Sequence, residues 1–576
     1  MRLKISNSKN SSSFYVIKDF TTKNNKRSTK IVEKLGNLKQ VTIKARGQDP
    51  YQWAKEYVAK LNKTLKLENP IIQINKNSGK QISKNNQITF NGGYLFLDKI
   101  YHELKLNKIC DNISKKYKFE FDLNSILSRL LYGRIIFPSS KLATYELSKK
   151  FIEQPNFELH QIYRALEIIA NEKNFIQSEV YKNSLEISNR NSAILYYDCT
   201  NYFFEIEQEE GLKQYCKSKE NRPNPAVQMG LFMDGDGIPL SFNITPGNTN
   251  EQTTMTPLEQ KILDDFKLSK FIVCTDAGLA SNANRKFNDK QDRAFITTQS
   301  IKKLKKFLMN WALSPEDWHL NNDKNTYNIN DLEKSDDNIE KYKDYIFYKE
   351  RWINENGLEQ KLIVTYSIKY KEYQRQIRNS QIERAKNVIK NSSIKLNKFN
   401  QNDYKRFVNK TNITSDGEIA EIATYSINNQ LIEKEERFDG FYSVCTNLDD
   451  DVSAIIKINK RRWEIEESFR IMKSEFKARP VYLKRDDRIT AHFTTCFLAL
   501  VLHRFLEKRL NEKFTSPQII QTLRNMNFLE VAGDGYIPTY TRTDLTDDLH
   551  EKFNFRTDYE INTIKNIKKI LKEVKI

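Results

Sequence analysis

The chain has 576 residues, a hydrophobic content of 39% and a formal net charge of +20 at pH 7. This hydrophobic content is enough for several packed domains, and it argues against a chain that is disordered throughout. The large positive charge favours a polyanionic partner, although a composition rich in lysine and asparagine is also what an AT-rich genome produces.

The placement of cysteine and histidine limits the cofactors to consider. The six cysteines lie far apart without a C-x-x-C pair, and the six histidines form no cluster with metal-ligand spacing. We therefore expect reduced thiols in a cytosolic protein, with neither a disulfide framework nor a zinc site. The start of the sequence lacks the apolar run of a signal peptide, and the longest apolar stretch, residues 497–502, is too short to cross a bilayer. We expect a soluble intracellular protein with no membrane partner.

The N-terminal third of the chain divides into a strand-forming part and a helical part. Residues 1–50 carry 12 basic and 3 acidic side chains, and two alternating runs within them, residues 13–20 and 28–36, predict a β-hairpin with a basic tip. This hairpin either contacts a polyanion or presents a solvated face. Helical periodicity then extends over about residues 95–190, and Pro138 marks a break in it.

From residue 192 onward, short apolar runs alternate with turns. The run over residues 192–199 predicts a buried strand that ends at Asp198, and D-G-D-G at 234–237 predicts a hairpin because glycine accepts a positive φ. A helix over residues 252–266 follows, then a strand ending at Asp276, a short helix and another strand. The order strand, hairpin, helix, strand, helix, strand matches a ribonuclease-H-like mixed sheet, in which carboxylates stand at strand ends.

The second half of the chain interrupts this core and then completes it. Residues of about 300–440 are strongly polar, and we interpret them as an inserted subdomain that contains strands and helices. A core strand returns over residues 438–446, a buried helix begins near residue 488, and a basic amphipathic helix ends the chain. The predicted fold class is therefore α/β: a ribonuclease-H-like mixed-sheet core with a β-containing insertion, an N-terminal β-hairpin and helical domain, and a helical C-terminal tail. The predicted domains are the basic N-terminal region with the hairpin (1–90), the helical domain (91–190), the first part of the core (191–300), the inserted subdomain (301–440), the second part of the core with a glutamate-bearing helix (441–510) and the basic helical C-terminal region (511–576).

Residues 459–473, which read N-K-R-R-W-E-I-E-E-S-F-R-I-M-K, predict one amphipathic helix. At ~100° per residue its apolar seam consists of Ile465, Phe469, Met472 and Phe476. Glu466 lies beside this seam with four cations: Arg462, Arg470, Lys473 and Lys477. A carboxylate in this position suits a group that holds a metal ion while its neighbours hold phosphates. Ordinary i,i+4 ion pairs on a surface helix explain the same pattern equally well.

Three carboxylates form a candidate catalytic triad: Asp198 and Asp276 at the ends of apolar strands, and Glu466 on the helix. Carboxylates that converge in a low-dielectric cleft repel one another unless cations neutralise them. Mg²⁺ fits this task because it prefers one or two carboxylates together with water and substrate phosphates. Two such ions ~3.5–4 Å apart would activate an attacking water or 3′-hydroxyl and stabilise the leaving oxygen. Each aspartate also has an ordinary explanation, an Asx-turn at Asp198 and a helix cap at Asp276.

At these positions the chain resembles the DDE transposases of bacterial insertion sequences, specifically the IS-four group with its signature Y-x2-R-x3-E-x6-K. With Glu466 as the glutamate, Arg462 and Lys473 fall in register, and Asn459 stands where the signature has tyrosine. The sequences around Asp198, around the hairpin that follows it and around F-I-V-C-T-D also resemble the group. The resemblance covers about residues 190–300 and 440–500. The long gap between the second aspartate and the glutamate resembles the group's β-rich insertion.

The resemblance implies a DNA transposase that cuts at the terminal inverted repeats of an insertion sequence and joins the 3′ ends to target DNA. It implies that Asp198, Asp276 and Glu466 bind two Mg²⁺ or Mn²⁺ ions. The DNA backbone would be held by Arg462, Lys473, Arg470 and Lys477.

The resemblance also implies the partners and the location of the protein. The partner would be double-stranded DNA, bound in part by the helical domain. The protein would form a homodimer on paired DNA ends, and it would be located in the bacterial cytoplasm at the nucleoid. In the related group an aromatic side chain of the insertion can stack on a flipped base. The sequence does not single out Trp311, Trp318 or Trp352 for this role, and for each of them it favours packing over stacking.

Two other functions fit the same residues. One is a domesticated metal-dependent DNA nuclease that retains the fold but does not mobilise an element. The other is a non-catalytic DNA-binding protein with a decayed core. The presence of all three carboxylates, together with Arg462 and Lys473, counts against decay.

Overall fold

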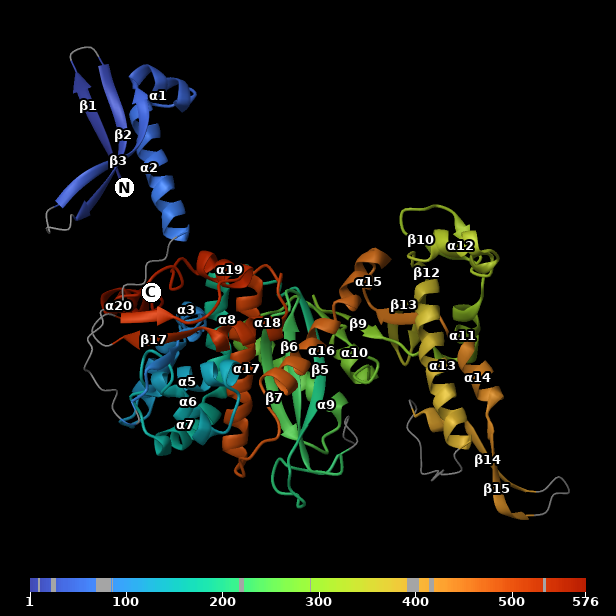
Figure 1. Cartoon of the computed structure of the whole chain (residues 1–576). Coiled ribbons are helices and arrows are strands. Elements are labelled where there is room, and N and C mark those ends of the chain that lie inside the picture. The colour runs from blue at the N-terminus through green and yellow to red at the C-terminus, as the bar shows by residue number, and fades with distance from the viewer. Residues whose placement is uncertain are drawn as a thin grey trace. The chain divides into compact units, whose positions relative to one another are not determined.

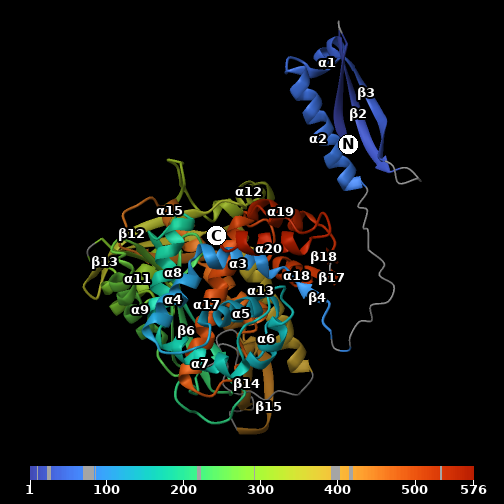
Figure 2. The same ribbon diagram turned by 90° about the vertical axis from the view of Figure 1, so that its left-hand side faces the viewer.

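The computed structural model describes the whole chain apart from residues 9–10, 22–26, 69–83, 85, 217–221, 291, 391–402, 414–418 and 532–534. The described residues form two compact units. One unit consists of Met1–Gly93 and Thr522–Val574, and the other consists of Tyr94–Gln521 with the last two residues. Figures 1 and 2 show the elements of both units from two directions.

The first unit begins with an antiparallel sheet of three strands, β1 (Arg2–Ser8), β2 (Ser11–Thr21) and β3 (Arg27–Asn37). The predicted hairpin is confirmed as β2 and β3, and the centre of its basic tip lies outside the described residues. Two helices follow that we did not predict, α1 (Leu38–Ala45) and α2 (Pro50–Glu68). They pack on the sheet through Phe14, Val16, Leu35, Val41, Ala54 and Val58. Both helices are rich in lysine, and in α2 the residues Trp53, Ala54, Tyr57, Val58 and Leu61 recur at helical spacing.

The remainder of the first unit combines a small sheet with helices. β17 (Asn527–Val531) pairs with β4 (Thr89–Asn91) on one side and with β18 (Gly535–Pro538) on the other. Two helices complete this part, α19 (Asp544–Phe553) and α20 (Ile564–Glu573). The predicted basic tail helix is confirmed as α20, in which Ile567 and Ile570 are buried while Lys565, Lys568 and Lys569 are exposed.

Six helices open the second unit, as the periodicity over residues 95–190 predicts. They are α3 (Tyr94–Glu103), α4 (Leu106–Lys116), α5 (Leu123–Ile136), α6 (Lys141–Ser148), α7 (Leu159–Asn171) and α8 (Lys173–Ile187). Pro138 lies in the connection between α5 and α6, where we expect a break. A seventh helix, α17 (Asp486–Arg509), packs against α3, α5 and α7 and is the predicted buried helix. Among the described helices, α17 is the one long and apolar enough to cross a membrane, but 89% of that apolar window is buried inside the protein.

A mixed sheet of ten strands forms the core of the second unit, in the order β11-β10-β12-β13-β16-β9-β8-β5-β6-β7. The strands outside the inserted segment are β5 (Ile194–Phe203), β6 (Ala226–Asp234), β7 (Pro239–Pro246) at one edge, β8 (Ile272–Thr275), β9 (Ala294–Thr298) and β16 (Phe441–Thr446). β8 runs parallel to β5 and to β9, and the other pairs are antiparallel. Two helices connect these strands, α9 (Glu251–Phe266) and α10 (Asn282–Phe287). The predicted α/β class and this order of elements are confirmed.

The first core strand is longer than predicted. We expected it to end at Asp198, but β5 continues to Phe203 because its antiparallel partner β6 keeps pairing as far as Ala226. Asp198 is therefore inside a strand, and an Asx-turn that ends the strand there is ruled out. The pairing of β5 with β8, in contrast, stops at Tyr196. Asp198 thus projects from the sheet just beyond the end of a neighbouring strand.

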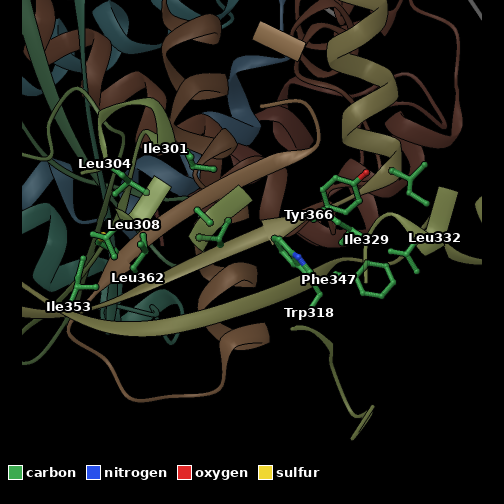
Figure 3. Close-up of a cluster of buried hydrophobic side chains, with 14 of the residues drawn as sticks. Ile301, Leu304, Leu308, Trp318, Ile329, Leu332, Phe347, Ile353, Leu362 and Tyr366 are labelled. Carbon is green, nitrogen blue, oxygen red and sulfur yellow. The ribbon is translucent and has the colours of Figure 1, made fainter. Parts of the chain in front are cut away.

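The inserted segment extends the core sheet and also contains a separate sheet of two strands. Its strands β10 (Trp318–Leu320), β11 (Thr326–Tyr327), β12 (Phe347–Glu355) and β13 (Leu358–Tyr366) join the core through the pairing of β13 with β16. Four helices, α11 (Lys306–Leu313), α12 (Asp336–Tyr342), α13 (Ile368–Lys390) and α14 (Asn429–Glu436), and one hairpin, β14 (Val408–Ile413) with β15 (Ile419–Ile427), complete the segment. Trp318 is fully buried beside Tyr366 in its apolar core, and its indole donates a hydrogen bond to the Ser314 carbonyl (Figure 3). Trp318 is therefore a packing residue, whereas Trp352 on β12 is 44% exposed.

None of the six cysteines, all of which lie in the described part of the chain, forms a disulfide bond. Burial raises the pKa of the Cys199 and Cys274 thiols to about 12, so neither is a thiolate at neutral pH. These two residues lie in the central strands close to the candidate aspartates, and they act there as packing groups and not as nucleophiles.

Candidate catalytic centre

Asp198 lies in β5, and Asp276 comes directly after the neighbouring strand β8. The parallel register of β5 and β8 pairs Tyr196 with Cys274. Asp198 and Asp276 have the same separation along the chain as this pair, so the register continued by two positions sets them opposite each other. Neighbouring strands lie ~4.8 Å apart. The strand register therefore places the backbones of two aspartates from distant parts of the sequence near each other where β8 ends.

The side chain of Asp198 points toward the glutamate-bearing segment. On one side of it along β5, the Tyr196 hydroxyl donates to the Ile458 carbonyl at 2.9 Å. On the other side, Lys473 Nζ donates to Thr200 Oγ1 at 2.8 Å. Since side chains alternate along a strand, Asp198 shares the face of Tyr196 and Thr200. This face of β5 is the one that the segment around Glu466 covers.

Asp276 directly follows the last residue of β8. Two residues before Asp276, Cys274 Sγ donates a hydrogen bond to Asn459 Oδ1 at 3.6 Å. The side chain of Cys274 therefore points toward α15 (Val452–Lys460). The Asp276 Oδ1 atom accepts hydrogen bonds at 3.0 Å from the amide of Gly278 and from the amide of the next residue. These bonds hold the carboxylate in one orientation within a turn. A cap on the following helix is ruled out as its role, because Ser281 caps α10.

Residues 459–473 form two helices and a π-helix, and our prediction of one continuous helix is wrong. α15 (Val452–Lys460) is followed by a short turn, then by α16 (Trp463–Arg470) and by the π-helix Ile471–Glu475. Asn459 belongs to α15 and is buried, with its amide donating to the Tyr442 hydroxyl at 2.9 Å. This bond ties α15 to the core sheet and separates it from α16. The predicted apolar seam is confirmed, because Ile465, Phe469, Met472 and Phe476 are all buried.

The three glutamates of α16 differ in their surroundings. Glu464 is paired with Arg461 at 2.8 Å and its side chain is 14% exposed. Glu467 makes two hydrogen bonds with Arg470, which lower its pKa. Glu466 is 57% exposed and forms an ion pair with Arg462, one turn earlier, at 3.3 Å. Glu466 is therefore the most accessible carboxylate of the helix.

Asp198, Glu466 and Lys473 line one hollow of about 440 Å³. Arg470 lines it as well, although its guanidinium is engaged by Glu467. Lys477, the fourth predicted cation, is exposed just beyond the π-helix and has a positive φ of 46°. The hollow thus brings one of the two aspartates, the glutamate and two of the predicted cations to the same surface.

Sequence reasoning missed two residues that line this hollow, Thr200 and Arg479. Thr200 has a recognisable signal, because it follows Asp198 by two residues in a strand and so must share its face. Arg479, whose guanidinium lies 5.0 Å from the centre of the Phe203 ring, gives no comparable signal in the sequence.

The three carboxylates do not form one group in the structure. Within the part of the chain that the structure describes, no three His, Cys, Asp or Glu side chains stand close enough to hold a metal ion. Asp198 is beside Asp276 through the strand register, and it shares the hollow with Glu466. The donor set fits an oxygen-preferring cation such as Mg²⁺. A shared site requires Glu466 to turn away from Arg462 and toward the aspartates.

The chain also has a family match. Residues 203–502, just over half of the chain, match the family model described as "Transposase DDE domain". This chain belongs to that family. The matched part of the DDE domain contains Asp276 and Glu466, and it begins shortly after Asp198.

Two solved structures of transposases show weak similarity to this DDE-domain protein. A piggyBac transposase synaptic complex with hairpin DNA has 8% identity and a TM-score of 0.36, over 75% of this chain and 78% of that one. A Mos1 transposase paired-end complex with the left transposon end has 10% identity and a TM-score of 0.13, over 43% of this chain and 69% of that one. No curated protein matches the sequence. The family assignment rests on the domain match alone.

Proposed function

We propose that this DDE-domain protein is a DNA transposase of the IS-four group with a ribonuclease-H-like catalytic core. It cuts at the terminal inverted repeats of an insertion sequence and joins the 3′ ends to target DNA. The observation that supports this most strongly is the hollow that Asp198, Glu466 and Lys473 share, with Asp276 at the end of the strand next to that of Asp198. The transposase DDE domain match supplies the reaction class.

The carboxylates of Asp198, Asp276 and Glu466 are the proposed ligands of two Mg²⁺ or Mn²⁺ ions. Such ions, when bound, activate the attacking water or 3′-hydroxyl and stabilise the leaving oxygen. The two aspartates contribute rigid positions, because one is inside a paired strand and the other is held by two backbone amides. Glu466 contributes an adjustable position, since it stands on a helix in an exposed ion pair.

Four cations are proposed to hold the DNA backbone: Arg462, Lys473, Arg470 and Lys477. Lys473 is fixed beside Asp198 by its hydrogen bond to Thr200, so a phosphate in the hollow would meet a positioned ammonium group. Arg462 becomes available as soon as Glu466 turns toward the aspartates. The ion pair between Arg462 and Glu466 is therefore the proposed arrangement in the absence of DNA. It keeps Arg462 from a phosphate and Glu466 from a metal ion until DNA binds.

The signature residue Asn459 has a structural role in this proposal. It replaces the tyrosine of the IS-four signature and is buried against Tyr442 of the core sheet. A buried amide in this place cannot reach DNA. The contact that the signature tyrosine makes is therefore left to other residues, while Arg462, Glu466 and Lys473 keep their spacing.

Double-stranded DNA is the proposed partner, bound as terminal inverted repeats and as target, and a homodimer on paired ends is the proposed assembly. The net charge of +20 supports double-stranded DNA as the partner. The bacterial cytoplasm, at the nucleoid, is the proposed location.

A plasmid assay tests the proposed function. The substrate carries the two ends of DNA that flank the gene, and the purified full chain is added with Mg²⁺ or Mn²⁺. A transposase releases the segment between the ends and leaves 3′-hydroxyl termini that join to a second plasmid. Cleavage without joining would favour the domesticated nuclease, and binding without cleavage at any metal concentration would favour the non-catalytic DNA-binding protein.

A further inference from the structure

The positive charge of the chain is concentrated at its N-terminus. Residues 1–68 carry 16 basic and 5 acidic side chains, a net charge of +11 out of +20 for the whole protein. The helical domain, residues 91–190, carries 15 basic and 12 acidic side chains, a net charge of only +3. Since neutralisation of phosphates provides most of the affinity of a protein for DNA, the N-terminal region is the stronger candidate for the DNA-binding module.

One face of the N-terminal sheet is used for folding. Leu3 and Ile5 of β1 and Phe14 and Val16 of β2 pack against α1 and α2. On β3, Glu33 accepts a hydrogen bond from Tyr57 of α2, and the buried Leu35 belongs to the same core. Figures 1 and 2 both show α1 and α2 on the same side of the three strands. The alternate residues of the strands must point the other way.

The opposite face presents cations around an aromatic ring. Strand register places Lys4 of β1 opposite Tyr15 of β2, and Tyr15 opposite Lys34 of β3. Both lysines are exposed, and neither has an ion-pair partner among the described residues. On β3 the neighbouring Ile31 and Val32 are 57% and 51% exposed. A face with unneutralised lysines, an aromatic ring and exposed aliphatic groups is suited to phosphates and to base edges together.

The size of this face fits a groove of duplex DNA. Three strands spaced ~4.8 Å apart place β1 and β3 roughly 10 Å from each other. The major groove of B-form DNA is about 12 Å wide and admits strands as well as helices. Lysines on the two outer strands would then face the phosphates on either side of the groove, with Tyr15 between them.

We propose that the outer face of the β1-β2-β3 sheet binds the major groove of double-stranded DNA, with Lys4 and Lys34 on the two phosphate backbones. The proposal rests on the proposed function in one respect, that the ligand is the DNA on which a transposase acts. In this proposal the N-terminal sheet binds the DNA, and the DDE domain catalyses the cleavage and joining of strands.

The test compares two double variants of the full chain, Lys4→Ala with Lys34→Ala on the sheet, and Lys55→Ala with Lys60→Ala on the exposed side of α2. Both remove two charges from exposed positions of the same unit. Fluorescence anisotropy with a short labelled duplex of mixed sequence gives the Kd over a range of salt concentrations. The sheet variant should bind about tenfold more weakly, and its plot of log K against log salt should be less steep by about 1.8, as the loss of two phosphate contacts requires. The α2 variant should bind within about threefold of the unmodified chain.

Equal weakening in both variants, or an unchanged salt slope in the sheet variant, would overturn the proposal. A loss of single-strand binding as large as the loss of duplex binding would also overturn it, because the face would then be a general polyanion surface. Cleavage by the unmodified chain is measured separately with Mn²⁺. A protein that fails to cleave but loses duplex affinity on substitution of Lys4 and Lys34 would contradict the proposed function and support this inference.

Discussion

Replacing Glu466 by glutamine should abolish metal-dependent DNA cleavage and leave DNA binding nearly unchanged. The substitution keeps the shape of the side chain and removes the negative charge that a divalent cation requires. Because the metal site would supply several kcal/mol of transition-state stabilisation, we expect a fall in cleavage rate of about 10³-fold or more. The measurement is strand cleavage of a terminal-repeat duplex with Mg²⁺ or Mn²⁺, together with a binding curve for the same duplex.

The matched control for this substitution is Glu467→Gln on the same helix. Glu467 is held by two hydrogen bonds from Arg470, and it does not line the hollow that contains Asp198. This variant should retain cleavage within about tenfold of the unmodified protein, since it loses an ion pair at the surface only. Full cleavage by Glu466→Gln, or equal loss in both variants, would remove Glu466 from the catalytic centre.

Replacing Asp234 by alanine should cause a large loss of stability in the core sheet. Asp234 and Arg190 form an ion pair at 2.7 Å, with side chains 0% and 1% exposed. The second carboxylate oxygen of Asp234 accepts hydrogen bonds from the amides of Asp236 and Ile238. Removal of the carboxylate leaves a buried guanidinium without its counter-ion, which costs about 3–5 kcal/mol.

A thermal melt of the full chain measures this effect. Asp234→Ala should lower the Tm of the second unit by several degrees. Lys182→Ala is the control, because its ion pair with Glu179 is on the surface of α8 and should contribute little. A Tm for Asp234→Ala equal to that of the control would show that the buried pair does not hold the β6–β7 hairpin to the end of α8.

The sequence predicted the core of the fold well, because local signals agree with the tertiary structure there. The β6–β7 hairpin follows from glycines in its turn, and α9 follows from the capping residue Asn250 and an apolar stripe. The apolar seam of Ile465 and Phe469 follows from helical spacing. In each case the residues that decide the local conformation are the same ones that pack in the core.

Two local errors arose where long-range contacts decide the structure. β5 continues past Asp198 because it pairs with β6 as far as Phe203, and no residue near Asp198 predicts this pairing. The segment 459–473 breaks after α15, where the buried Asn459 bonds to Tyr442 of the preceding strand β16. Helical periodicity alone continues through the break, so the sequence favours one helix.

The candidate site was identified from residue types, but its geometry needed the strand register. The sequence contains the separation between Asp198 and Asp276, yet this separation has meaning only once β5 and β8 are known to be parallel with the same offset. The convergence of all three carboxylates stays a prediction. It depends on a movement of Glu466 away from Arg462, and no pattern of residues in the sequence predicts such a movement.

The most direct test of the catalytic centre is the anomalous scattering of Mn²⁺ in crystals of the protein bound to a terminal-repeat duplex. We expect manganese peaks within about 2.6 Å of carboxylate oxygens from Asp198, Asp276 and Glu466, next to a DNA phosphate. Manganese bound elsewhere, with the oxygen of Glu466 still on Arg462 and outside reach of both aspartates, would contradict it.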